Sequence, residues 1–543
     1  MDDATDAMTV EWQEWGQEAF DRAQDAGQPI LLSISAEWCG WCQTMDATTY
    51  AEPRIGAILN HDFVPIRVDA DRHPRVRDRY NAGGFPSTVL LTPAGELLAA
   101  ASYLDAEQMR RILDRALEEW EEEGDGAGRL PHTLRDREPP AGALGEDVER
   151  YINGQVDTQF DAEHGGWGTD EKFPLPATLE FALKRQRSKA TQTLAAITDH
   201  LFDDPDGGFF RHASAADWSE PMREKLLDVN AGLLRAYAHA YLVTGEESYR
   251  HVADRTVGYL TTTLWTGSGF GNSQQPGEYF ERPAAERAER EAPPIDPTTY
   301  TDANALAADA LAWYTAYTDD DTAREHGMET LSFLESNRVH DGVVDHTEGG
   351  ESSGILAAQA GALRAFATGG QVLDTDHVEA ARAIADATID RLQTDTGAFR
   401  DGPAEGPGLL DRALYPIDDN ARVADALVDL SYLTGEARYR DAATAALEAF
   451  AGAADRMGPQ VARYGTAVSR TVRRPLVIGV GTEPGADLHR AALRMADHEK
   501  VVVPGASGVD EGSAAILTTD GPRGEATTPA ALASLVVEYD PGV

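Results

Sequence analysis

Two cysteines constrain the fold of this chain more than any other feature of its sequence. Cys39 and Cys42 are the only cysteines among 543 residues, and two residues separate them. The apolar run 29–34 precedes the pair and a segment with helical spacing follows it, so we expect a strand, the cysteine pair and then a helix. At a helix N-terminus, unpaired amide groups lower the pKa of the first cysteine. The pattern predicts a redox pair in which Cys39 attacks and Cys42 resolves a mixed disulfide.

A later segment fits a loop that faces such a pair. Phe85 and Pro86 stand directly before a strand-like run that ends in the apolar residues 89–91. A cis X-Pro bond is uncommon enough that its placement beside a redox pair would be a functional feature. We therefore expect Phe85 and Pro86, together with Trp38 and Trp41, to form the surface that faces the substrate.

The charge balance narrows the classes of partner. The chain carries 92 acidic and 47 basic residues, and only five of the basic residues are lysines. An acidic surface with little lysine suits a cytosol of very high salt, where screening removes most of the self-repulsion. We interpret the protein as salt-adapted and halophilic, and a merely acidic mesophilic protein is the alternative. A nucleic-acid-binding protein would need a basic stripe, and the sequence shows none.

Targeting, membrane and metal signals are missing from the sequence. Residues 1–6 are acidic and lack the apolar core of a secretory signal. No stretch reaches the roughly 18 consecutive apolar residues of a membrane span. His61 and His73 do not match the usual spacing of zinc ligands around two cysteines. We expect a cytoplasmic protein without a metal or other cofactor, apart from a Cys39–Cys42 disulfide.

The chain divides into an α/β part, a linker, a helical part and a short tail. Residues 9–123 alternate strand-like and helical segments, and Asp105 begins their last helix. Residues 124–145 are polar and rich in glycine and proline, which is typical of a linker. Residues 471–543 read as strand, helix and strand, a small α/β appendage without cysteine.

The region 146–470 is helical and repetitive. Loops in which glycine precedes an aromatic or apolar residue recur six times, and paired helical segments follow them. Asp-x-Asn or Asp-Asp-Asn begins several of these helices, near residues 228, 302 and 418, and glycine ends two of them. One helical hairpin cannot bury its apolar face alone. The repeat therefore predicts six hairpins closed into a ring, an (α/α)6 toroid.

These motifs resemble those of the spermatogenesis-associated, thioredoxin-like family, which joins a thioredoxin-like domain to an α/α toroid. The family's Cys-His-Trp-Cys-His-x-Met matches residues 39–45, with Gly40 and Gln43 in place of its histidines. Its Gly-Gly-Trp-Pro resembles residues 83–86, with Phe85 in place of the tryptophan. The resemblance covers residues 10 to about 470. It also implies that the buried carboxylate of thioredoxins, their proton acceptor, would fall at Ser33.

The second half carries further family motifs. Residues 161–168 resemble its Asp-x-x-x-Gly-Gly-Phe-Gly, with Trp167 in place of the phenylalanine, and residues 172–174 match its Lys-Phe-Pro. Residues 218–225 match Trp-x-x-Pro-His-Phe-Glu-Lys, with Met222 at the histidine position. Asp296 and Asn304 fit its Asp-Asp-Lys and Trp-Asn-Gly elements.

The predicted ring resembles six-hairpin glycosidases and sugar 2-epimerases, whose sites lie at the mouth of the barrel. The aromatic candidates for stacking on a sugar there are Trp167, Phe209, Trp218 and Phe270. Four carboxylates there could act as acid/base groups: Glu224, Asp296, Asp418 and Asp419. His212 could substitute for the histidine that epimerases of this fold use. Asn304 is a further polar candidate. The alternative is structural, because Asp and Asn at helix starts are usually caps and aromatic residues after Gly-Gly usually pack the loop.

Three functions fit these patterns. In the first, the protein is a thiol-disulfide oxidoreductase acting on a protein thiol or disulfide, and the toroid recognises the substrate or partner. In the second, the protein is a sugar epimerase or hydrolase whose α/β domain is an accessory module. In the third, it is a non-catalytic interaction protein. We expect neither a nucleic-acid nor a membrane partner, and the sequence does not determine the oligomeric state.

Overall fold

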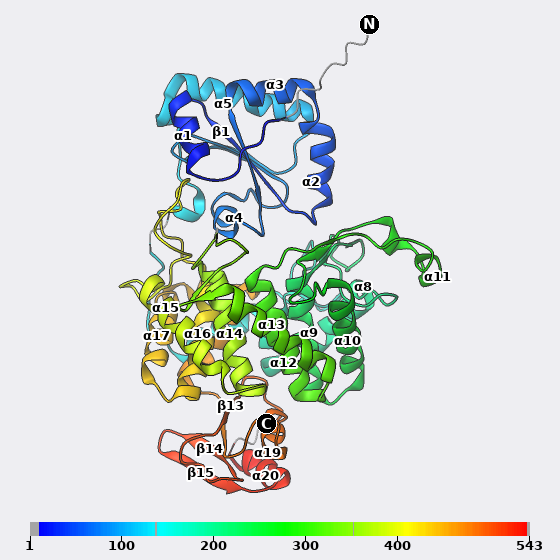
Figure 1. Ribbon diagram of the computed structural model, residues 1–543, viewed down its shortest axis with the longest axis vertical. Helices are drawn as coiled ribbons and strands as arrows, with labels where there is room; N and C mark the ends of the chain where they lie inside the picture. Colours follow the sequence, from blue (N-terminus) through cyan, green and yellow to red (C-terminus); the bar gives the residue numbers. More distant parts are fainter. Residues whose placement is uncertain (1–9, 136–137, 351, 540–543) are drawn as a thin grey trace. The chain divides into compact units, whose positions relative to one another are not determined.

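The computed structural model describes residues 10–135, 138–350 and 352–539 (Figure 1). The acidic segment 1–6, on which the argument against a secretory signal rests, lies outside the described residues, as does the first residue of the predicted domain 9–123. The chain forms two compact units. Unit 1 comprises residues 1–138 and 401–414, and unit 2 comprises residues 139–400 and 415–543.

Unit 1 is the predicted thioredoxin-like α/β fold. Its sheet has the order β2-β1-β3-β4, with β1 parallel to β2 and antiparallel to β3, and with β3 and β4 forming a hairpin. The strands are β1 (Ile30–Ser35), β2 (Val64–Asp69), β3 (Ser87–Leu91) and β4 (Leu97–Ala101). The helices are α1 (Gln17–Ala26), α2 (Gly40–Met45), which continues as a π-helix (Asp46–Tyr50), α3 (Pro53–Asp62), α4 (Pro74–Tyr80) and α5 (Ala106–Glu123).

Buried apolar residues of the strands and an N-terminal capping box of α5 stabilise these elements. Leu31 of β1 and Leu90 of β3 pair across the sheet and share a buried cluster with Met45 of α2. Asp105 caps α5 as predicted, since its carboxylate accepts from the Gln108 amide and the Gln108 side chain returns a bond to the Asp105 amide. Such a capping box satisfies two orphan donors at once.

A loop from the helical region completes unit 1. Residues 401–414 lie inside the predicted toroid 146–470, yet they pack against α4. The hydroxyl of Tyr80 donates to the backbone oxygens of Gly95 (2.8 Å) and Gly408 (2.5 Å). At Gly408, where φ is +65°, a Cβ would come within 2.4 Å of the Trp15 ring. Sequence patterns gave no sign of this loop, because its partners lie more than 300 residues away.

Unit 2 contains the predicted (α/α)6 toroid. Within the described residues, six inner helices each contact the next, and α18 contacts α7 to close the ring. The inner helices are α7 (Pro176–Arg185), α9 (Leu227–Thr244), α12 (Thr301–Thr318), α14 (Leu356–Val372), α16 (Ile417–Thr434) and α18 (Ala462–Val472). The outer helices are α6 (Glu146–Thr158), α8 (Arg187–Leu201), α10 (Glu247–Tyr259), α13 (Asp321–Arg338), α15 (His377–Leu392) and α17 (Ala437–Glu448).

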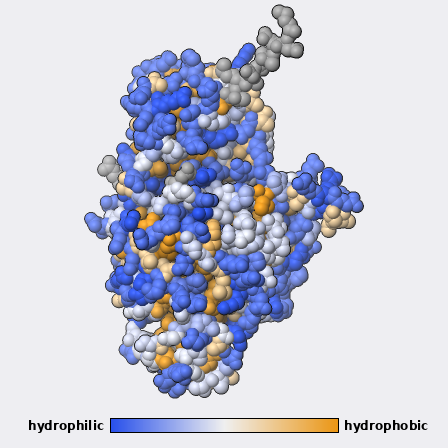
Figure 2. Space-filling view, in the orientation of Figure 1, coloured by the Kyte–Doolittle hydropathy of each residue, from blue (hydrophilic) through white to orange (hydrophobic). Residues whose placement is uncertain are grey.

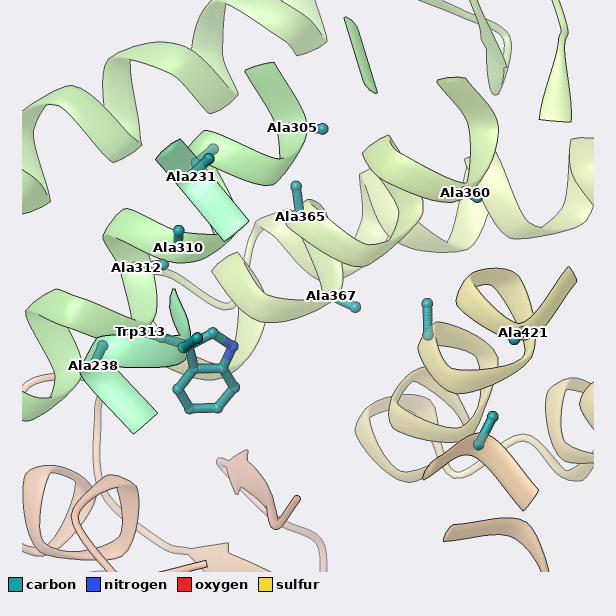
Figure 3. Close-up of a cluster of buried hydrophobic side chains, with 14 of the residues drawn as sticks. Ala231, Ala238, Ala305, Ala310, Ala312, Trp313, Ala360, Ala365, Ala367 and Ala421 are labelled. Carbon is teal, nitrogen blue, oxygen red and sulfur yellow. The ribbon is translucent and has the colours of Figure 1, made fainter. Parts of the chain in front are cut away.

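Small residues let the inner helices pack closely. The cluster in Figure 3 contains Trp313 and alanines of α9, α12, α14 and α16. A helix that is buried on most of its circumference needs an apolar surface all round. The predicted glycine stops are present, since Gly245 after α9 and Gly435 after α16 have φ values of +70° and +73°, which favour glycine.

Short strands and helices fill the loops of the ring. They are β5 (His212–Ala213), β6 (Pro221–Met222), β7 (Lys225–Leu226), β8 (Ser273–Gln274), α11 (Ala284–Arg287), β9 (Ile295–Asp296), β10 (Val339–His340) and β11 (Val343–Val344). β5 pairs with β6, β8 lies between β7 and β9, and β10 pairs with β11.

The tail is an α/β appendage, as predicted, and it belongs to unit 2. Its sheet has the order β13-β12-β14-β15. The elements are β12 (Val477–Val480), α19 (Asp487–Leu493), β13 (Val501–Pro504), β14 (Ala514–Thr518), β15 (Gly521–Ala526) and α20 (Pro529–Tyr539). β13 contacts α14 and α16, and α19 contacts α12, so the appendage packs directly on the inner helices.

The visible surface is largely hydrophilic (Figure 2), which fits a composition of 26% charged residues. Among the described residues, none of the helices combines the length and the apolar character that a membrane span requires.

Candidate functional site

The two cysteines form a disulfide at the start of α2. Their Cα atoms lie 5.2 Å apart, and Cys39 is the N-cap residue of the helix. The backbone N–H of Cys42 donates to Sγ of Cys39 over 3.1 Å. Exposure does not distinguish the two residues, since Cys39 is 5% and Cys42 is 4% exposed. The hydrogen bond distinguishes the two cysteines, because an amide donor stabilises negative charge on the Cys39 sulfur and so favours its thiolate.

The end of β2 anchors the loop that carries the pair. Oδ2 of Asp69 accepts from the backbone N–H of Glu37 over 3.2 Å, and Oδ1 of Asp69 accepts from the backbone N–H of Asp71 over 2.9 Å. Oδ2 of Asp71 accepts from Nε1 of Trp38 over 2.8 Å. Asp69 and Asp71, at the end of β2 and just beyond it, therefore position the redox loop from the neighbouring strand.

The predicted proline loop lies beside this site. The Phe85–Pro86 peptide bond is cis, and the Phe85 ring meets the Trp38 ring edge-on at 5.6 Å. Trp41, between the cysteines, is 58% exposed and meets Tyr103 at 5.6 Å. Trp38 is buried, Phe85 is half-buried and Pro86 is buried. Tyr103 belongs to no recognised motif, and sequence reasoning missed it.

Hydroxyl groups occupy the interior where thioredoxins carry a carboxylate. Ser33 is buried and lies directly opposite Thr88 in the sheet. It shares a face of β1 with Leu31, the face that α2 covers. Burial raises the pKa of the adjacent Tyr50, and the Ser33 and Thr88 hydroxyls oppose that shift only in part. Tyr50 therefore stays protonated at neutral pH and cannot accept a proton from Cys42.

The four aromatic candidates of the toroid are packing residues. Each is at most 2% exposed, and none lines a cavity that we describe below. The indole of Trp167 donates to the Val156 carbonyl, and that of Trp218 donates to the His164 carbonyl. The backbone amides of Phe209 and Phe270 are bound by the asparagines of the next inner helices.

Asn304 holds a loop and does not cap its own helix. It is the fourth residue of α12, and its Oδ1 accepts from the Phe270 amide over 2.7 Å while its Nδ2 donates to the Phe270 carbonyl over 3.0 Å. Asn230 and Asn420 make the same pair of bonds to Phe209 and Phe399. The repeated Asn thus joins three of the glycine loops to the next inner helix, which explains its recurrence.

The remaining polar candidates are dispersed. Glu224 is buried and accepts from Nε of Arg211 over 2.6 Å. Asp296, in β9, accepts from the Thr298 amide over 3.0 Å. His212 stacks on Phe173 at 4.4 Å. Burial, aided by the charge of Arg211, lowers the pKa of His212 to about 4, so the imidazole is neutral at pH 7.

Asp418 lines a cavity of the toroid, and the other candidates are not among the described residues that line it. This cavity has a volume of about 280 Å³ and lies at the N-terminal ends of the inner helices. We name it the toroid mouth. Its charged lining residues are Asp228, Arg235, Asp302, Asp418, Arg422 and Arg463. Asp419 lies outside the lining. Asp228 and Asp302 occupy the same repeated Asp position as Asp418, a signal that could have identified them.

The other end of the ring carries a buried charge network. Arg235 binds Glu180 and Asp309, and its side chain is 5% exposed. A smaller cavity of about 40 Å³ shares Ala177, Arg235, Arg422 and Arg463 with the mouth. Residues 497–500 of the appendage seal this end, since Glu499 binds Arg185 over 2.6 Å.

Comparison with known proteins agrees with this architecture. Residues 4–129 match a family model, Thioredox_DsbH, described as "Protein of unknown function, DUF255". Human spermatogenesis-associated protein 20 is 30% identical over 318 residues, which are 50% of this chain and 40% of that protein. The chain thus spans less than half the length of this relative.

Two further similarities are more limited in extent. A protein disulfide-isomerase of Schizosaccharomyces pombe is 39% identical over 67 residues, 12% of this chain and 18% of that protein. A solved sugar epimerase from a ruminal bacterium has a TM-score of 0.47 at 12% identity and covers 56% of this chain and 85% of its own. Together with the site geometry, the family-model match and the human relative confirm that the chain resembles the spermatogenesis-associated, thioredoxin-like family.

Proposed function

We propose that this protein is a thiol-disulfide oxidoreductase whose redox group is the Cys39–Cys42 disulfide. The observation that carries the proposal is the geometry of the pair: a disulfide at the start of α2 in which the Cys42 amide donates to the Cys39 sulfur. The Phe85–Pro86 loop beside it supports the same function. No further cofactor is needed, because the two sulfur atoms hold and release the electrons themselves.

The reducing direction takes two steps. The Cys39 thiolate attacks a partner disulfide, so that a Cys39–partner bond forms and the partner's other sulfur leaves as a thiolate that takes a proton from solvent. Cys42 then loses its proton and attacks Cys39, which releases the partner's second thiolate. Two electrons pass to the partner and the Cys39–Cys42 disulfide remains. The oxidising direction is the reverse, and the reduction potential of the pair sets which one operates.

Aromatic side chains around the disulfide fit a protein partner. Trp41 is the most exposed large hydrophobic residue of the described chain at 58%, and it lies between the two cysteines. Exposed aromatic groups contribute binding area at low entropic cost, which suits an extended peptide segment. We infer that the partner is a protein thiol or disulfide bound across Trp41 and Phe85. The toroid would add recognition of the substrate or partner.

The second candidate, a carbohydrate-active enzyme, has one observation in its favour. Asp418 lines the toroid mouth, where it lies with other carboxylates. The aromatic residues expected to stack on sugars are buried in the loops instead. Blocking Cys39 separates the candidates, because only an oxidoreductase loses its function when that sulfur is blocked.

A trapping experiment tests the proposed function. A Cys42→Ser variant keeps the attacking sulfur and removes the resolving one, so the mixed disulfide with a peptide or protein disulfide should accumulate. A Cys39→Ser variant is the matched control and should trap nothing. Molar potassium chloride is the appropriate medium, because a net charge of −45 repels itself strongly at low salt. Equal trapping by both variants, or by neither, would refute the assignment.

A further inference from the structure

We propose that loop 401–414 positions the proline loop, Phe85–Pro86, and that Asn81 transmits this position to it. The inference rests on the proposed oxidoreductase function and adds positioning residues to it. Loop 401–414 comes from the toroid region of the sequence, yet it packs in unit 1. There it contacts the chain on both sides of the proline loop, namely α4 before it and the β3–β4 turn after it.

Two arginines of α4 bind loop 401–414. Nε of Arg75 and Nη1 of Arg79 both donate to Oδ2 of Asp401 over 2.7 Å. Nη2 of Arg79 also donates to the Arg412 carbonyl over 2.7 Å, near the other end of the loop. Charged hydrogen bonds are stronger than neutral ones, and burial protects them from screening by salt. Because the Arg79 side chain is fully buried, α4 is held firmly against both ends of the loop.

Loop 401–414 also packs on the turn that joins β3 and β4. A Cβ at Gly95 in this turn would come within 2.7 Å of Cα of Gly408, so the two backbones are in close contact. The Tyr80 hydroxyl, at the end of α4, lies 2.8 Å from the Gly95 carbonyl oxygen and 2.5 Å from the Gly408 carbonyl oxygen. β3 begins directly after Pro86. This contact thus fixes the strand that follows the proline loop, while the arginines fix the helix before it.

Asn81 connects the end of α4 to the proline loop. It follows the last residue of α4, and its Oδ1 accepts from the backbone N–H groups of Gly83 over 2.8 Å and of Gly84 over 2.9 Å. The Ser87 hydroxyl donates to the Gly84 carbonyl over 2.6 Å, on the other side of the proline loop. These bonds shape the turn, so a displacement of α4 moves the proline loop with it. Asn81 is therefore a positioning residue for the surface that binds the partner.

Loop 401–414 is closed at its base and anchored beside it. The Asp401 N–H donates to the Leu414 carbonyl over 2.8 Å, and the Leu414 N–H donates to Oδ1 of Asp401 over 3.1 Å. Just before the loop, the Asn420 side chain of α16 binds both the N–H and the carbonyl of Phe399. A loop closed in this way holds α4 as one body. The toroid region thereby contributes to the redox site through its own chain, without a ligand.

A displaced proline loop should weaken partner binding and leave the sulfur chemistry intact. The Cys39 thiolate is stabilised within α2, by the Cys42 N–H. A protein partner also needs the surface of Phe85 to place its disulfide against Cys39, and a misplacement of about 1 Å can cost about 100-fold in rate. A small disulfide reagent does not need this surface. Loop 401–414 should therefore affect the reaction with a peptide but not the reaction with a small reagent.

Mixed-disulfide formation by the full chain carrying Cys42→Ser tests this inference in molar potassium chloride. One probe is an unfolded peptide whose single cysteine carries a thionitrobenzoate group, and the other is Ellman's reagent, the small symmetric disulfide of that group. The Cys39 sulfur attacks the peptide sulfur, a Cys39–peptide disulfide forms, and the coloured thionitrobenzoate thiolate leaves and is measured. The half-saturating peptide concentration reports binding, and the maximal rate reports the reaction. Every variant is assayed below its melting temperature.

Variants at both ends of the linkage make the test specific. Asn81→Leu should raise the half-saturating peptide concentration about tenfold, because the turn loses the acceptor that shapes it. Asn81→Asp keeps an acceptor for both N–H groups and should restore the parent value. Tyr80→Phe, which loses the hydroxyl between Gly95 and Gly408, should raise it about threefold or more. The matched control is Glu405→Gln, at an exposed residue of the same loop, and should bind the peptide as the parent does. All four variants should react with Ellman's reagent as the parent does.

Three outcomes would overturn the inference. Unchanged peptide binding in both Asn81→Leu and Tyr80→Phe would refute the positioning role. Equal slowing with both probes would show that these residues have a structural role only. An effect of Asn81→Leu without any effect of Tyr80→Phe would refute the contribution of loop 401–414. A parent protein that reacts with neither probe would refute the proposed function itself, which distinguishes the two failures.

Discussion

Replacing Asp401 by asparagine should destabilise unit 1 strongly. The Asp401 carboxylate binds Nη1 of Arg79 over 2.7 Å and Nε of Arg75 over 2.7 Å. The side chains are 3% exposed for Asp401, 0% for Arg79 and 12% for Arg75. Removing the carboxylate takes away the counter-ion that these two buried cations share. Breaking a buried ion pair in this way costs about 3–5 kcal/mol.

This free energy corresponds to a measurable shift in melting temperature. In a unit of about 150 residues, 1 kcal/mol corresponds to about 2–4 °C, so Asp401→Asn should lower the transition of unit 1 by about 6–20 °C. Differential scanning calorimetry measures the shift, and hydrogen exchange of peptides from unit 1 assigns it. The control is Asp78→Asn, which removes a half-exposed partner of Arg77 and should cost less than about 1 kcal/mol.

The pH dependence provides a second check on the same carboxylate. Burial alone would raise the pKa of Asp401, but the hydrogen bonds and charges of Arg79 and Arg75 hold it below the usual value. Stabilisation by a carboxylate with a lowered pKa is fully present above the unfolded pKa of about 3.9 and is lost as the pH falls through the folded value. The difference between the two proteins should persist from pH 5 to 8. If Asp401→Asn melts no lower than Asp78→Asn, the assignment of loop 401–414 to unit 1 is wrong.

Three further changes test other parts of the account. Asn304→Ala should lower the free energy of unfolding of unit 2 by about 2 kcal/mol or more, because it leaves the buried amide and carbonyl of Phe270 unpaired. Asn337→Ala, at an exposed asparagine, should lower it by less than about 0.5 kcal/mol. Equal denaturation midpoints for the two variants would contradict this prediction. Ser33→Asp should speed thiol-disulfide exchange at pH 7 about tenfold, because the new carboxylate can accept a proton from Cys42. Ser33→Asn, which adds no proton acceptor, should leave the rate unchanged. An unchanged rate in Ser33→Asp would show that a carboxylate at position 33 does not act as the proton acceptor. Burial lowers the pKa of Lys500 to about 7, so the unfolded chain binds more protons than the folded chain between pH 7 and 10. Lys500→Met should therefore raise the melting temperature at pH 7 and raise it less at pH 9.5, whereas Lys184→Met, at a lysine whose pKa is raised, should not show this pattern. An equal gain at both pH values would contradict the lowered pKa of Lys500.

The redox site could be predicted almost completely from the sequence because its signals are local. The strand before Cys39, the helix after Cys42 and the proline loop each follow from a few neighbouring residues, and the Phe85–Pro86 bond is cis in the structure. The glycine-aromatic repeat likewise predicted the ring, since each hairpin carries its own pattern. Tyr103 was missed because only the fold brings it to Trp41.

The toroid site was less predictable because its signals are shared with structural roles. The repeated Asp-x-Asn element contains two functions: the Asn binds a loop, while Asp228 and Asp302 line the mouth. Sequence reasoning left capping and a site at the mouth as alternatives for Asn304 and Asp418, and it did not single out Asp228 or Asp302. Arg422 and Arg463 belong to no motif, and only ring closure brings them together. Loop 401–414 packs on residues more than 300 positions away, a distance over which local patterns carry no information.

The most direct test of the central claim is the redox titration of Cys39 and Cys42 in molar potassium chloride, combined with the pH dependence of Cys39 alkylation in the Cys42→Ser variant. The account predicts a reversible two-electron disulfide and a Cys39 thiol that reacts as a thiolate well below the ordinary cysteine pKa of about 8.5. The measured potential would then give the direction of electron flow. Two thiols that never pair, or a Cys39 that alkylates only above about pH 8.5, would contradict the oxidoreductase assignment.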